Sequence, residues 1–129
     1  MRNPWKQFER PGYKLIDLGR PAFFLIPVKK LKWKIGGKTA LKVLQNFLTE
    51  EFGAYTDFRI PNCGIWRESA KIVVADESRA FKVAFVGKIK ITKLIKKLAE
   101  LAEALEEKCI YFEAGEDACM IEPKTRTAR

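Results

Sequence analysis

Glu68 is the side chain in this 129-residue sequence whose type and position most strongly suggest chemistry. It ends a segment, FGAYTDFRIPNCGIWRE (52–68), that places Gly, Pro, Asn and several aromatic residues between two strongly patterned elements. If a strand begins at Gly64, alternation puts Glu68 on the same face as Trp66 and Ala70, beneath the helices. A carboxylate in such a place is usually paired, at the mouth of a cleft, or functional. A bulge or a solvated strand end is the plainer explanation, and both remain open.

Aromatic and polar side chains of the same loop could form the walls of a binding pocket. Tyr55 and Trp66 flank the loop and could stack on a planar ring such as a nucleobase. Arg59 or Arg67 could meet a carboxylate or a phosphate, and Asn62 adds hydrogen-bonding capacity. The alternative for both aromatic rings is packing in the core. The predicted residues are Glu68 and Tyr55 as catalytic groups, and Trp66, Arg67, Arg59 and Asn62 as ligand-binding groups.

A lysine cluster marks the beginning of the second helix that the pattern predicts. Lys88, Lys90 and Lys93 gather there, whereas glutamates gather toward the helix end, an arrangement that opposes the helix dipole. Free N–H groups and lysines at a helix start can bind an anion, such as a phosphate or an acidic partner. We predict an anion-binding site at these three lysines. Lysines that are only solvated are the alternative.

The sequence also excludes several kinds of catalysis. It contains no histidine, which removes Ser-His and Cys-His nucleophile systems and a His-ligated zinc. Its three cysteines, Cys63, Cys109 and Cys119, form no CxxC pair and are expected to be reduced thiols. We expect no metal and no cofactor, so any chemistry must use carboxylates, Lys, Tyr or the substrate itself.

The composition predicts a single basic domain. A chain of 129 residues, 47% of them hydrophobic, can bury a core without a metal or disulfides. A net charge of +9 favours anionic partners such as nucleic acid, nucleotides or acidic proteins. The first apolar run (22–28) is too short and too far from the start for a signal peptide or a membrane span. We therefore expect a cytoplasmic protein with no membrane partner.

The spacing of apolar residues predicts two helices and several strands. Helical spacing covers 39–52, ended by Gly53, and 91–107, where an apolar stripe lies opposite a charged side. Strands are expected over 22–33, 64–76, 80–86, 109–113 and 118–122, with hairpin turns at 76–79 and 114–117.

Alternation in the two hairpins assigns their faces. In the central hairpin it puts Phe81, Val83 and Phe85 on the inward face, together with Glu68. In the closing hairpin it points Ile110, Phe112, Cys119 and Ile121 inward. Cys109 then lies on the opposite face from Cys119, which disfavours a bridge between them.

The order strand, helix, strand, strand, helix, strand indicates the α+β class. We predict a ferredoxin-like split βαβ sandwich, in which an antiparallel sheet carries two helices on one face. An N-terminal arm and a small C-terminal hairpin are added to it. The single domain comprises an arm laid over the body (1–21), a core (22–122) and a flexible basic tail (123–129).

The sheet face without helices is expected to be unusually apolar. It collects Val73, Ala84, Val86, Tyr111 and Met120, more apolar surface than a solvated sheet face normally shows. Either the N-terminal arm or a second copy of the chain must cover it. We favour a homo-oligomer formed through this outer sheet face.

A set of short motifs adds a resemblance. The chain contains Gly53-Ala54-Tyr55, then Gly64-Ile65-Trp66-Arg67-Glu68, a lysine-rich hairpin, an Ala/Leu/Glu-rich helix and Lys108-Cys109-Ile110. This layout, over residues 23–121, resembles the small phage-encoded S-adenosylmethionine-degrading enzymes. Those enzymes have a GxY loop and a G-x-aromatic-Arg-Glu strand in an oligomeric ferredoxin-like domain. The sequence departs from them at Glu107-Lys108, where their glutamine before the last strand is missing. A bacterial family with an FGGYT loop is similar to these residues as well.

The resemblance implies a viral lyase. In such an enzyme the carboxylate of S-adenosylmethionine attacks the substrate's own side chain, displaces methylthioadenosine and leaves homoserine lactone. This chemistry needs positioning more than a base, which suits a chain without histidine. The resemblance implies that Glu68 faces the ammonium or cationic end of the substrate, and that Tyr55 lines its pocket.

Two other classes of function stay open. A non-enzymatic basic binding protein, viral in origin if the resemblance holds, would use its lysine clusters against nucleic acid or an acidic protein. A scaffold protein would bind no small-molecule or nucleotide-like ligand and would make a large apolar contact through the outer sheet face.

Overall fold

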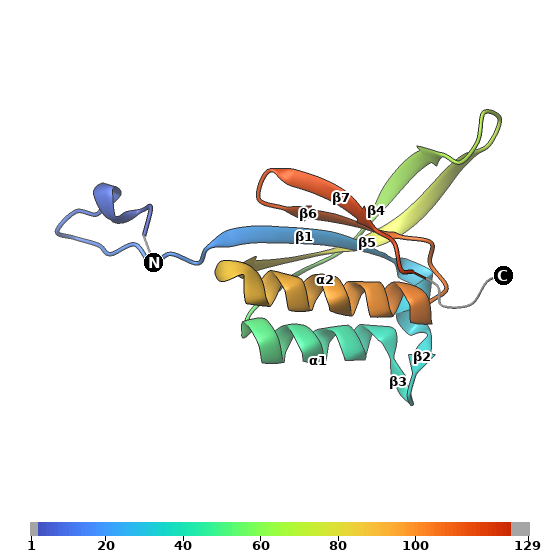
Figure 1. The fold of residues 1–129 in the computed structure, drawn as a ribbon, viewed down its shortest axis with the longest axis horizontal. Helices are drawn as coiled ribbons and strands as arrows, with labels where there is room; N and C mark the ends of the chain where they lie inside the picture. Colours follow the sequence, from blue (N-terminus) through green and yellow to red (C-terminus); the bar gives the residue numbers. More distant parts are fainter. Residues whose placement is uncertain (1–2, 125–129) are drawn as a thin grey trace.

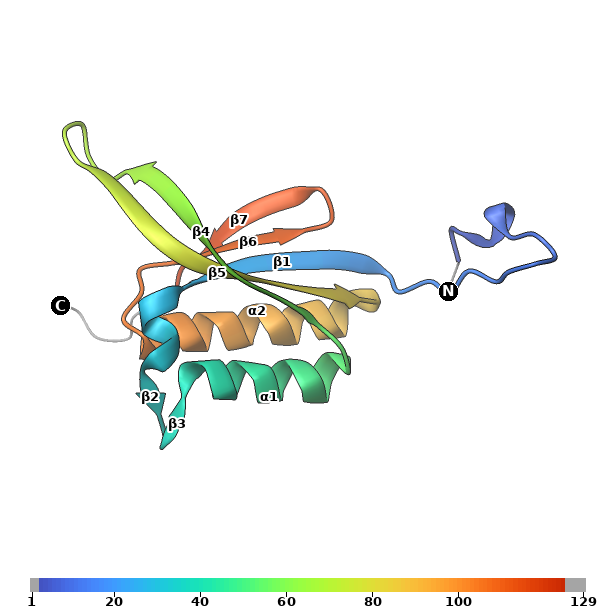
Figure 2. The same ribbon diagram turned by 180° about the vertical axis from the view of Figure 1, so that it is seen from behind.

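A strand of aromatic and branched residues, β1 (Arg20–Pro27), runs through the centre of the sheet in the computed structural model, which describes residues 3–124. The sheet has five antiparallel strands in the order β4-β5-β1-β6-β7. The other strands are β4 (Thr56–Arg67), β5 (Val73–Phe85), β6 (Ile110–Ala114) and β7 (Asp117–Ile121). Two helices, α1 (Ala40–Phe52) and α2 (Gly87–Ala104), lie side by side under one face (Figures 1 and 2). The α+β class and the one-sided helix layer are confirmed.

Helix α1 begins and ends where the sequence predicts. The Thr39 hydroxyl accepts a hydrogen bond from the Lys42 amide at 3.2 Å, which caps the first turn. At the other end Gly53 adopts φ +76°, and its amide donates to the Thr49 carbonyl at 3.0 Å. Leu44 and Leu48 are buried against the sheet. These local signals therefore fix the point at which the chain leaves α1 toward Tyr55.

Helix α2 is displaced by three or four residues from the predicted range of 91–107. It starts at Gly87 and ends at Ala104, because Leu105 and Glu106 leave helical geometry and Glu106 takes a positive φ. Its buried stripe consists of Leu94, Leu98, Leu101 and Ala102, as the helical spacing indicates.

The core lies between the sheet and the helices. Phe24 of β1 stacks on Phe81 of β5, with 5.5 Å between the ring centroids and both side chains fully buried. Burying one such side chain contributes about 1.5–3 kcal/mol relative to leaving it exposed. The inward alternation predicted for Phe81, Val83 and Phe85 is confirmed.

The strand predicted over 22–33 is too long. Pro27 ends β1, and the chain continues as a short 3-10 helix, η2 (Val28–Lys32), before a small two-stranded sheet of β2 (Lys34–Ile35) and β3 (Lys38–Thr39). Proline lacks the N–H that would continue the ladder. The lysine-rich stretch after Pro27 therefore forms a turn region and not a strand.

The closing hairpin has the predicted strands, but one of its side chains differs. Ile110, Phe112 and Ile121 are buried, whereas Cys119 is exposed although it pairs with Phe112. The reason is that β7 is the edge of the sheet, where few side chains lie below it. All three cysteines are free thiols.

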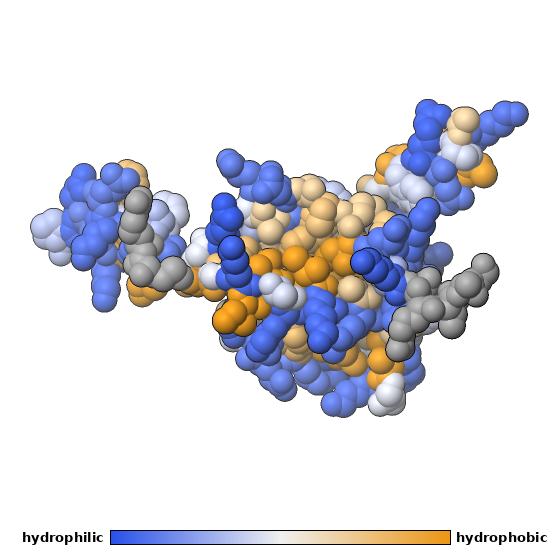
Figure 3. Space-filling view, in the orientation of Figure 1, coloured by the Kyte–Doolittle hydropathy of each residue, from blue (hydrophilic) through white to orange (hydrophobic). Residues whose placement is uncertain are grey.

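The N-terminal arm does not lie over the body. Residues 3–19 lead away from one end of the sheet, and an extension of the β4–β5 hairpin projects from the other end (Figure 1). In the space-filling view each projection is a separate lobe that shows both hydrophilic and hydrophobic residues (Figure 3). The expectation that the arm lies over the body is wrong, and of the two alternatives for the outer sheet face, cover by the chain's own arm is not what the structure shows. A short 3-10 helix, η1 (Lys6–Phe8), lies within the arm.

Two remaining expectations concern the chain end and membranes. Of the tail expected over 123–129, residues 125–129 lie outside the described residues. None of the described helices is long and apolar enough to cross a membrane.

Candidate functional site

The central hairpin turns at a different place from the one the sequence predicts. Its turn lies between Arg67 and Val73, where the Glu68 amide donates to the Ile72 carbonyl at 2.8 Å. The segment expected to turn, 76–79, continues as the middle of β5, with Ser78 paired to Asn62. β5 is therefore much longer than the predicted strand 80–86, and β4 lies earlier in the chain than the predicted strand 64–76. Alternation counted from the wrong turn assigns the wrong environment to Glu68.

An ion pair and a neighbouring strand explain why 76–79 stays extended. Arg79 opposes Ile26 in the central strand, and its guanidinium binds the Asp57 carboxylate of β4 with two hydrogen bonds. These partners hold the polar residues in the sheet. The actual turn uses small and polar residues, and Arg67 closes it by donating from Nη1 to the Ala70 carbonyl at 2.9 Å.

Glu68 consequently lies at the exposed tip of the β4–β5 hairpin. The expectation that its carboxylate points beneath the helices is wrong. Trp66 beside it is 46% exposed and donates from Nε1 to Oδ2 of Asp76 at 3.2 Å. The tip therefore presents an aromatic ring, a guanidinium and a carboxylate to solvent.

The opposite end of the hairpin holds Tyr55 next to a group that the sequence did not single out. Tyr55 is half-buried and packs against the hydrophobic core just before β4. Arg79 lies near it, with Nε 2.8 Å from Oδ1 of Asp57 and the guanidinium carbon 5.9 Å from the centre of the Phe81 ring. The hydrogen bonds that Arg79 donates to Asp57 raise the pKa of Arg79, which burial alone would lower. The Arg79 guanidinium therefore stays protonated beside the Asp57 carboxylate.

Sequence reasoning could have found Asp57 in this cluster. Tyr55 directly precedes β4 and Asp57 is two residues further on, and alternation over these residues predicts that they share a face. Arg79 is likewise two residues before the buried Phe81. The signal for Arg79 was hidden because the segment that contains it was interpreted as a turn.

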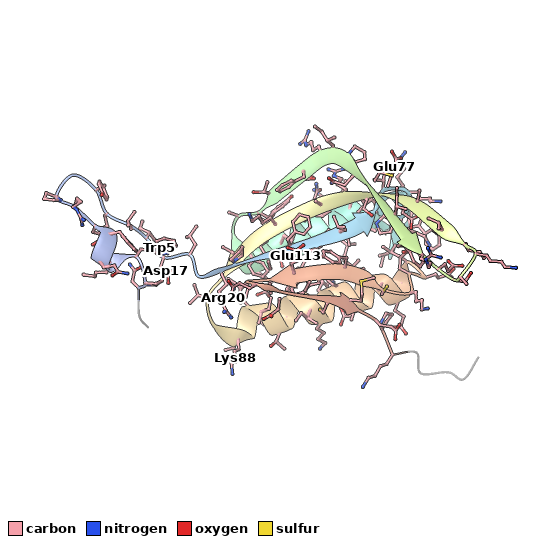
Figure 4. All side chains as sticks on the ribbon, turned by 90° about the horizontal axis from the view of Figure 1, so that it is seen from above. Trp5, Asp17, Arg20, Glu77, Lys88 and Glu113 are labelled. Carbon is pink, nitrogen blue, oxygen red and sulfur yellow. The ribbon has the colours of Figure 1, made fainter. Side chains whose placement is uncertain are left out.

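The three lysines predicted as an anion site lie at the start of α2 (Figure 4 labels Lys88). Lys90 and Lys93 each place Nζ 3.5 Å from Oε2 of Glu51, and Lys90 also donates to the Glu51 carbonyl. The end of α1 is thereby tied to the start of α2. Part of this lysine cluster serves the packing of the two helices, since cations at a helix C-terminus are favourable.

The remaining predicted ligand-binding residues lie on the free edge of the sheet. Arg59 and Asn62 are exposed on β4, where the register with β5 shifts between Phe58 and Asn62. Pro61 lies inside this irregular stretch, a position that an edge strand tolerates. Neither side chain contacts Tyr55 or the tip through a hydrogen bond in the described part of the chain.

The structure therefore separates the predicted site into two groups. Tyr55 and the α2 lysines lie at one end of β4, and Trp66, Arg67 and Glu68 lie at the other. At roughly 3.3 Å per residue, the thirteen-residue step from Tyr55 to Glu68 spans about 40 Å. One small substrate cannot touch both groups within a single chain.

Two cavities lie elsewhere on the molecule. One, of about 180 Å³, is lined by Pro21, Phe23, Lys82, Glu113 and Gly115 on the outer sheet face. The other, of about 700 Å³, lies at the end of α2 and is lined mostly by glutamates and Lys108. Within residues 3–124, no group of three His, Cys, Asp or Glu side chains is arranged to hold a metal ion.

The comparisons with known proteins identify similar structures only. No protein-family profile and no curated protein matches the sequence. A solved phage SAM lyase in complex with S-methyl-5'-thioadenosine superimposes with a TM-score of 0.56 at 17% identity, covering 85% of this chain and 94% of that one. A phage SAM lyase in the apo state gives a TM-score of 0.56 at 14% identity, covering 89% of this chain and 98% of that one. The remote resemblance stated from the short motifs is thus confirmed at the level of the fold.

Proposed function

We propose that this protein binds S-adenosylmethionine and cleaves it to methylthioadenosine and homoserine lactone. The observation that carries the proposal is the shared fold with phage SAM lyase, one structure of which holds S-methyl-5'-thioadenosine, along nearly the whole of both chains. The GxY loop and the motif from Gly64 to Glu68, which covers the end of β4 and the start of the turn, support the same conclusion. We also interpret the sheet order, with the helices on one face, as the ferredoxin-like split βαβ arrangement.

The proposed reaction is an internal displacement. A carboxylate oxygen of the substrate attacks its own γ-carbon, the carbon–sulfur bond breaks, and the bonding electron pair moves to the sulfonium sulfur. Methylthioadenosine leaves as a neutral thioether, and the remaining fragment closes into homoserine lactone. No proton is transferred in this step, so the absence of histidine from the sequence is compatible with it. The protein's task is to hold the substrate in the folded conformation that the attack needs.

The predicted residues divide this task between them. Glu68 binds the substrate's ammonium group, and Arg67 and Trp66 beside it contact the carboxylate and the adenine ring. Tyr55 lines the pocket at the other end, where Asp57 and Arg79 hold the surrounding strands. Arg59 and Asn62 along the edge of β4 supply further polar contacts, and Lys88, Lys90 and Lys93 attract anionic groups.

Both ends of the hairpin can serve one substrate only if two chains contribute. Tyr55 and Glu68 are about 40 Å apart along β4 by the strand rise, far more than a nucleoside with an amino-acid side chain can span. We therefore propose a homo-oligomer in which the projecting tip of one copy reaches the Tyr55 end of another. The outer sheet face is the proposed contact, and a cytoplasmic location follows from the substrate.

Titration calorimetry with S-adenosylmethionine tests this proposal. Injection into the protein should release heat that continues after mixing, because turnover follows binding. S-adenosylhomocysteine is the matched control ligand, since its thioether has no sulfonium leaving group and should give binding heat alone. Absence of heat with both ligands would remove the small-molecule function.

Mixing variants tests the shared site separately. Tyr55→Phe and Glu68→Gln should each be nearly inactive, whereas an equimolar mixture that has exchanged subunits should recover part of the activity. Recovery requires that the two residues of one site come from different chains. If the mixture stays as inactive as its components, both residues act within one chain or neither acts.

A basic binding protein is the second candidate function. The net charge of +9 and the exposed lysines along α2 favour a nucleic acid or an acidic protein as partner. Binding of this kind weakens steeply as salt rises, so affinity for single-stranded and duplex DNA measured from 25 to 200 mM salt examines it. If neither DNA binds even at the lowest salt concentration, nucleic acid is excluded as the partner.

A further inference from the structure

The stretch of chain that follows β1 is positively charged and has no acidic residue beside it in the sequence. No Asp or Glu occurs between Asp17 and Glu50, whereas lysines are frequent there. In the structure these lysines lie on η2, on the small sheet of β2 and β3, and in the first turn of α1. We call the exposed ones the lysine platform, which consists of Lys29, Lys32, Lys34, Lys38 and Lys42. The proposed lyase reaction gives them no role.

The backbone holds the platform in a defined shape. Gly36 and Gly37 make the two-residue turn between β2 and β3 with φ +57° and +87°, values that such a turn requires. The Ala40 amide donates to the Trp33 carbonyl at 2.7 Å, and the Trp33 amide donates to the Lys30 carbonyl at 3.1 Å. The resulting ribbon projects from the end of the body opposite to the N-terminal arm (Figures 1 and 2).

The platform lysines have no acidic partners. In the described part of the chain, none of the five makes an ion pair. Lys30 differs, since its Nζ lies 3.4 Å from Oε2 of Glu107 and thereby fastens η2 to the acidic end of α2. At the start of α2, Lys90 and Lys93 likewise share the carboxylate of Glu51. The platform therefore keeps a charge that the lysine cluster of α2 partly loses.

Uncompensated charges of one sign make this region costly in the free protein. The platform ammonium groups lie within residues 29–42 and repel one another. A ribbon with two residues in each strand adds little stability to offset this repulsion. The first turn of α1 also contains no acidic residue that would favour the helix dipole. A bound polyanion would relieve the repulsion.

An aromatic ring lies among the platform lysines. Trp33 is 40% exposed, whereas the other large apolar side chains of residues 28–42 are less exposed. The Lys30 Nζ lies 3.9 Å from the centre of the ring and covers one of its faces. A single ring is too small to form the apolar centre of a protein interface or to insert into a lipid surface. An aromatic ring beside a row of cations is instead typical of surfaces that bind single-stranded nucleic acid.

We propose that the lysine platform binds the phosphate backbone of a single-stranded nucleic acid, with Trp33 stacked on a base. The lysines release counterions from the phosphates, and the ring adds a contact that every base can make. Binding is therefore strongly dependent on salt and only weakly dependent on sequence. This inference is independent of the lyase activity, and it uses a different surface from the α2 lysines that support the second candidate function.

Fluorescence anisotropy of a labelled oligothymidylate of about fifteen nucleotides measures this binding with the full chain. For a single strand, the logarithm of the affinity falls with the logarithm of the salt concentration at a slope of about −0.7 for each neutralised phosphate. Five platform lysines thus predict a slope of about −3.5, or about a hundredfold weaker binding at 200 mM than at 50 mM salt.

A charge variant locates the binding surface. Lys32→Gln/Lys34→Gln/Lys38→Gln removes three platform cations, all of them exposed and without ion pairs in the described chain. Affinity at 50 mM salt should fall about a hundredfold, and the salt slope should shrink to about −1.4.

A matched variant separates the platform from net charge. Lys6→Gln/Lys14→Gln/Lys71→Gln removes three exposed lysines from the arm and the hairpin tip and gives the same net charge. It should leave both the affinity and the slope close to those of the wild type. If the two triple variants weaken binding equally, the nucleic acid binds the overall charge of the protein, and the inference is overturned.

Tryptophan fluorescence tests the stacking without a change at Trp33. In the Trp5→Phe/Trp66→Phe background Trp33 is the one tryptophan left, and a stacked base should quench its emission. Trp33→Ala should weaken binding about tenfold, whereas Trp33→Phe keeps a ring and should retain most of the affinity. Unchanged emission on saturation with the oligonucleotide would overturn the role of the ring.

Other anions decide whether nucleic acid is the right partner. A labelled polyglutamate peptide of about fifteen residues represents an acidic protein, and vesicles of phosphatidylserine and phosphatidylcholine represent a lipid surface. Binding of either as tightly as the oligonucleotide would overturn the assignment to nucleic acid. No binding of the oligonucleotide at 25 mM salt would overturn the inference itself, while the lyase activity is judged by product formation alone.

Discussion

The two ends of the β4–β5 hairpin have the same backbone pairing and opposite surroundings. At the root, Phe81 is fully buried and Asp57 binds Arg79 between the strands. At the tip, Ile65 is 72% exposed and Trp66 is 46% exposed, and the helices do not reach them. Ladder hydrogen bonds hold both ends, but only the root adds side-chain packing.

The difference shows which residues are available for function. A side chain at the root is needed for stability, so its replacement affects the whole domain. A side chain at the tip has only the hairpin itself to contact, so the exposed aromatic ring, arginine and glutamate there bury little surface. The proposed function assigns these tip residues to contacts with the substrate in an assembly of copies.

The largest loss of folding stability is expected for a substitution at the root of the hairpin. Phe81→Ala should lower the free energy of unfolding by about 3–5 kcal/mol, because it removes a buried ring stacked on Phe24 and leaves a cavity. Ile65→Ala at the tip is the control and should cost about 0.5 kcal/mol or less. Urea unfolding measures both. Equal losses would show that the tip is packed as tightly as the root.

The second prediction concerns a tip residue whose replacement should affect catalysis and not stability. Glu68→Gln should lower kcat/KM for S-adenosylmethionine about a hundredfold through loss of the charge-assisted contact to the substrate, with the unfolding midpoint unchanged. Glu77→Gln is the matched control, an exposed glutamate on the same hairpin (Figure 4). If both variants retain full activity, Glu68 has no part in the reaction.

The third effect concerns the ion pair at the root. Asp57→Asn should cost about 1–3 kcal/mol, because the partly buried Arg79 keeps its charge and loses its partner. Since the pKa of Arg79 is raised, its contribution is fully present at neutral and mildly alkaline pH. Asp76→Asn, which weakens only the exposed bond to Trp66, should cost much less. Thermal unfolding at low salt would show the contrast, and equal costs would contradict it.

The smallest effect is in thiol reactivity. Burial raises the pKa of Cys109, and Glu122 adds to this, whereas Cys63 is exposed on the projecting hairpin. Iodoacetamide should modify Cys63 faster than Cys109, which mass analysis of the peptides would show. The rate for Cys109 should rise at a higher pH than the rate for an ordinary thiol, because the thiolate is the reactive form. Faster modification of Cys109 at pH 8 would mean that its surroundings open readily.

Local signals allowed much of the fold to be predicted from the sequence. Helix α1 has a capping threonine, a helical stripe and a terminal glycine, and all three depend only on neighbours in the chain. The inward alternation of Phe81, Val83 and Phe85 was likewise predictable, because it depends on strand periodicity alone. The α+β class followed from the order of these elements.

The failures arose where distant partners decide the structure. The Asp57–Arg79 pair and the pairing of β5 with β1 keep a turn-like sequence, 76–79, extended. Neither partner is near in sequence, so local composition favoured the wrong turn. Because of this error the sequence analysis placed Glu68 on a buried face, whereas the structure has it at an exposed tip, far from Tyr55. The resemblance of the short motifs to phage S-adenosylmethionine-degrading enzymes does not depend on where the hairpin turns. It therefore indicated the correct fold despite this error.

Product analysis in ¹⁸O-labelled water tests the central proposal most directly. Purified protein is incubated with S-adenosylmethionine, and the products are separated by chromatography and weighed by mass spectrometry. Internal displacement predicts methylthioadenosine and homoserine lactone in equal amounts, with no label on the γ-oxygen, since that oxygen comes from the substrate's own carboxylate. Absence of methylthioadenosine, or a γ-oxygen that carries ¹⁸O from attack by water, would contradict the proposed reaction.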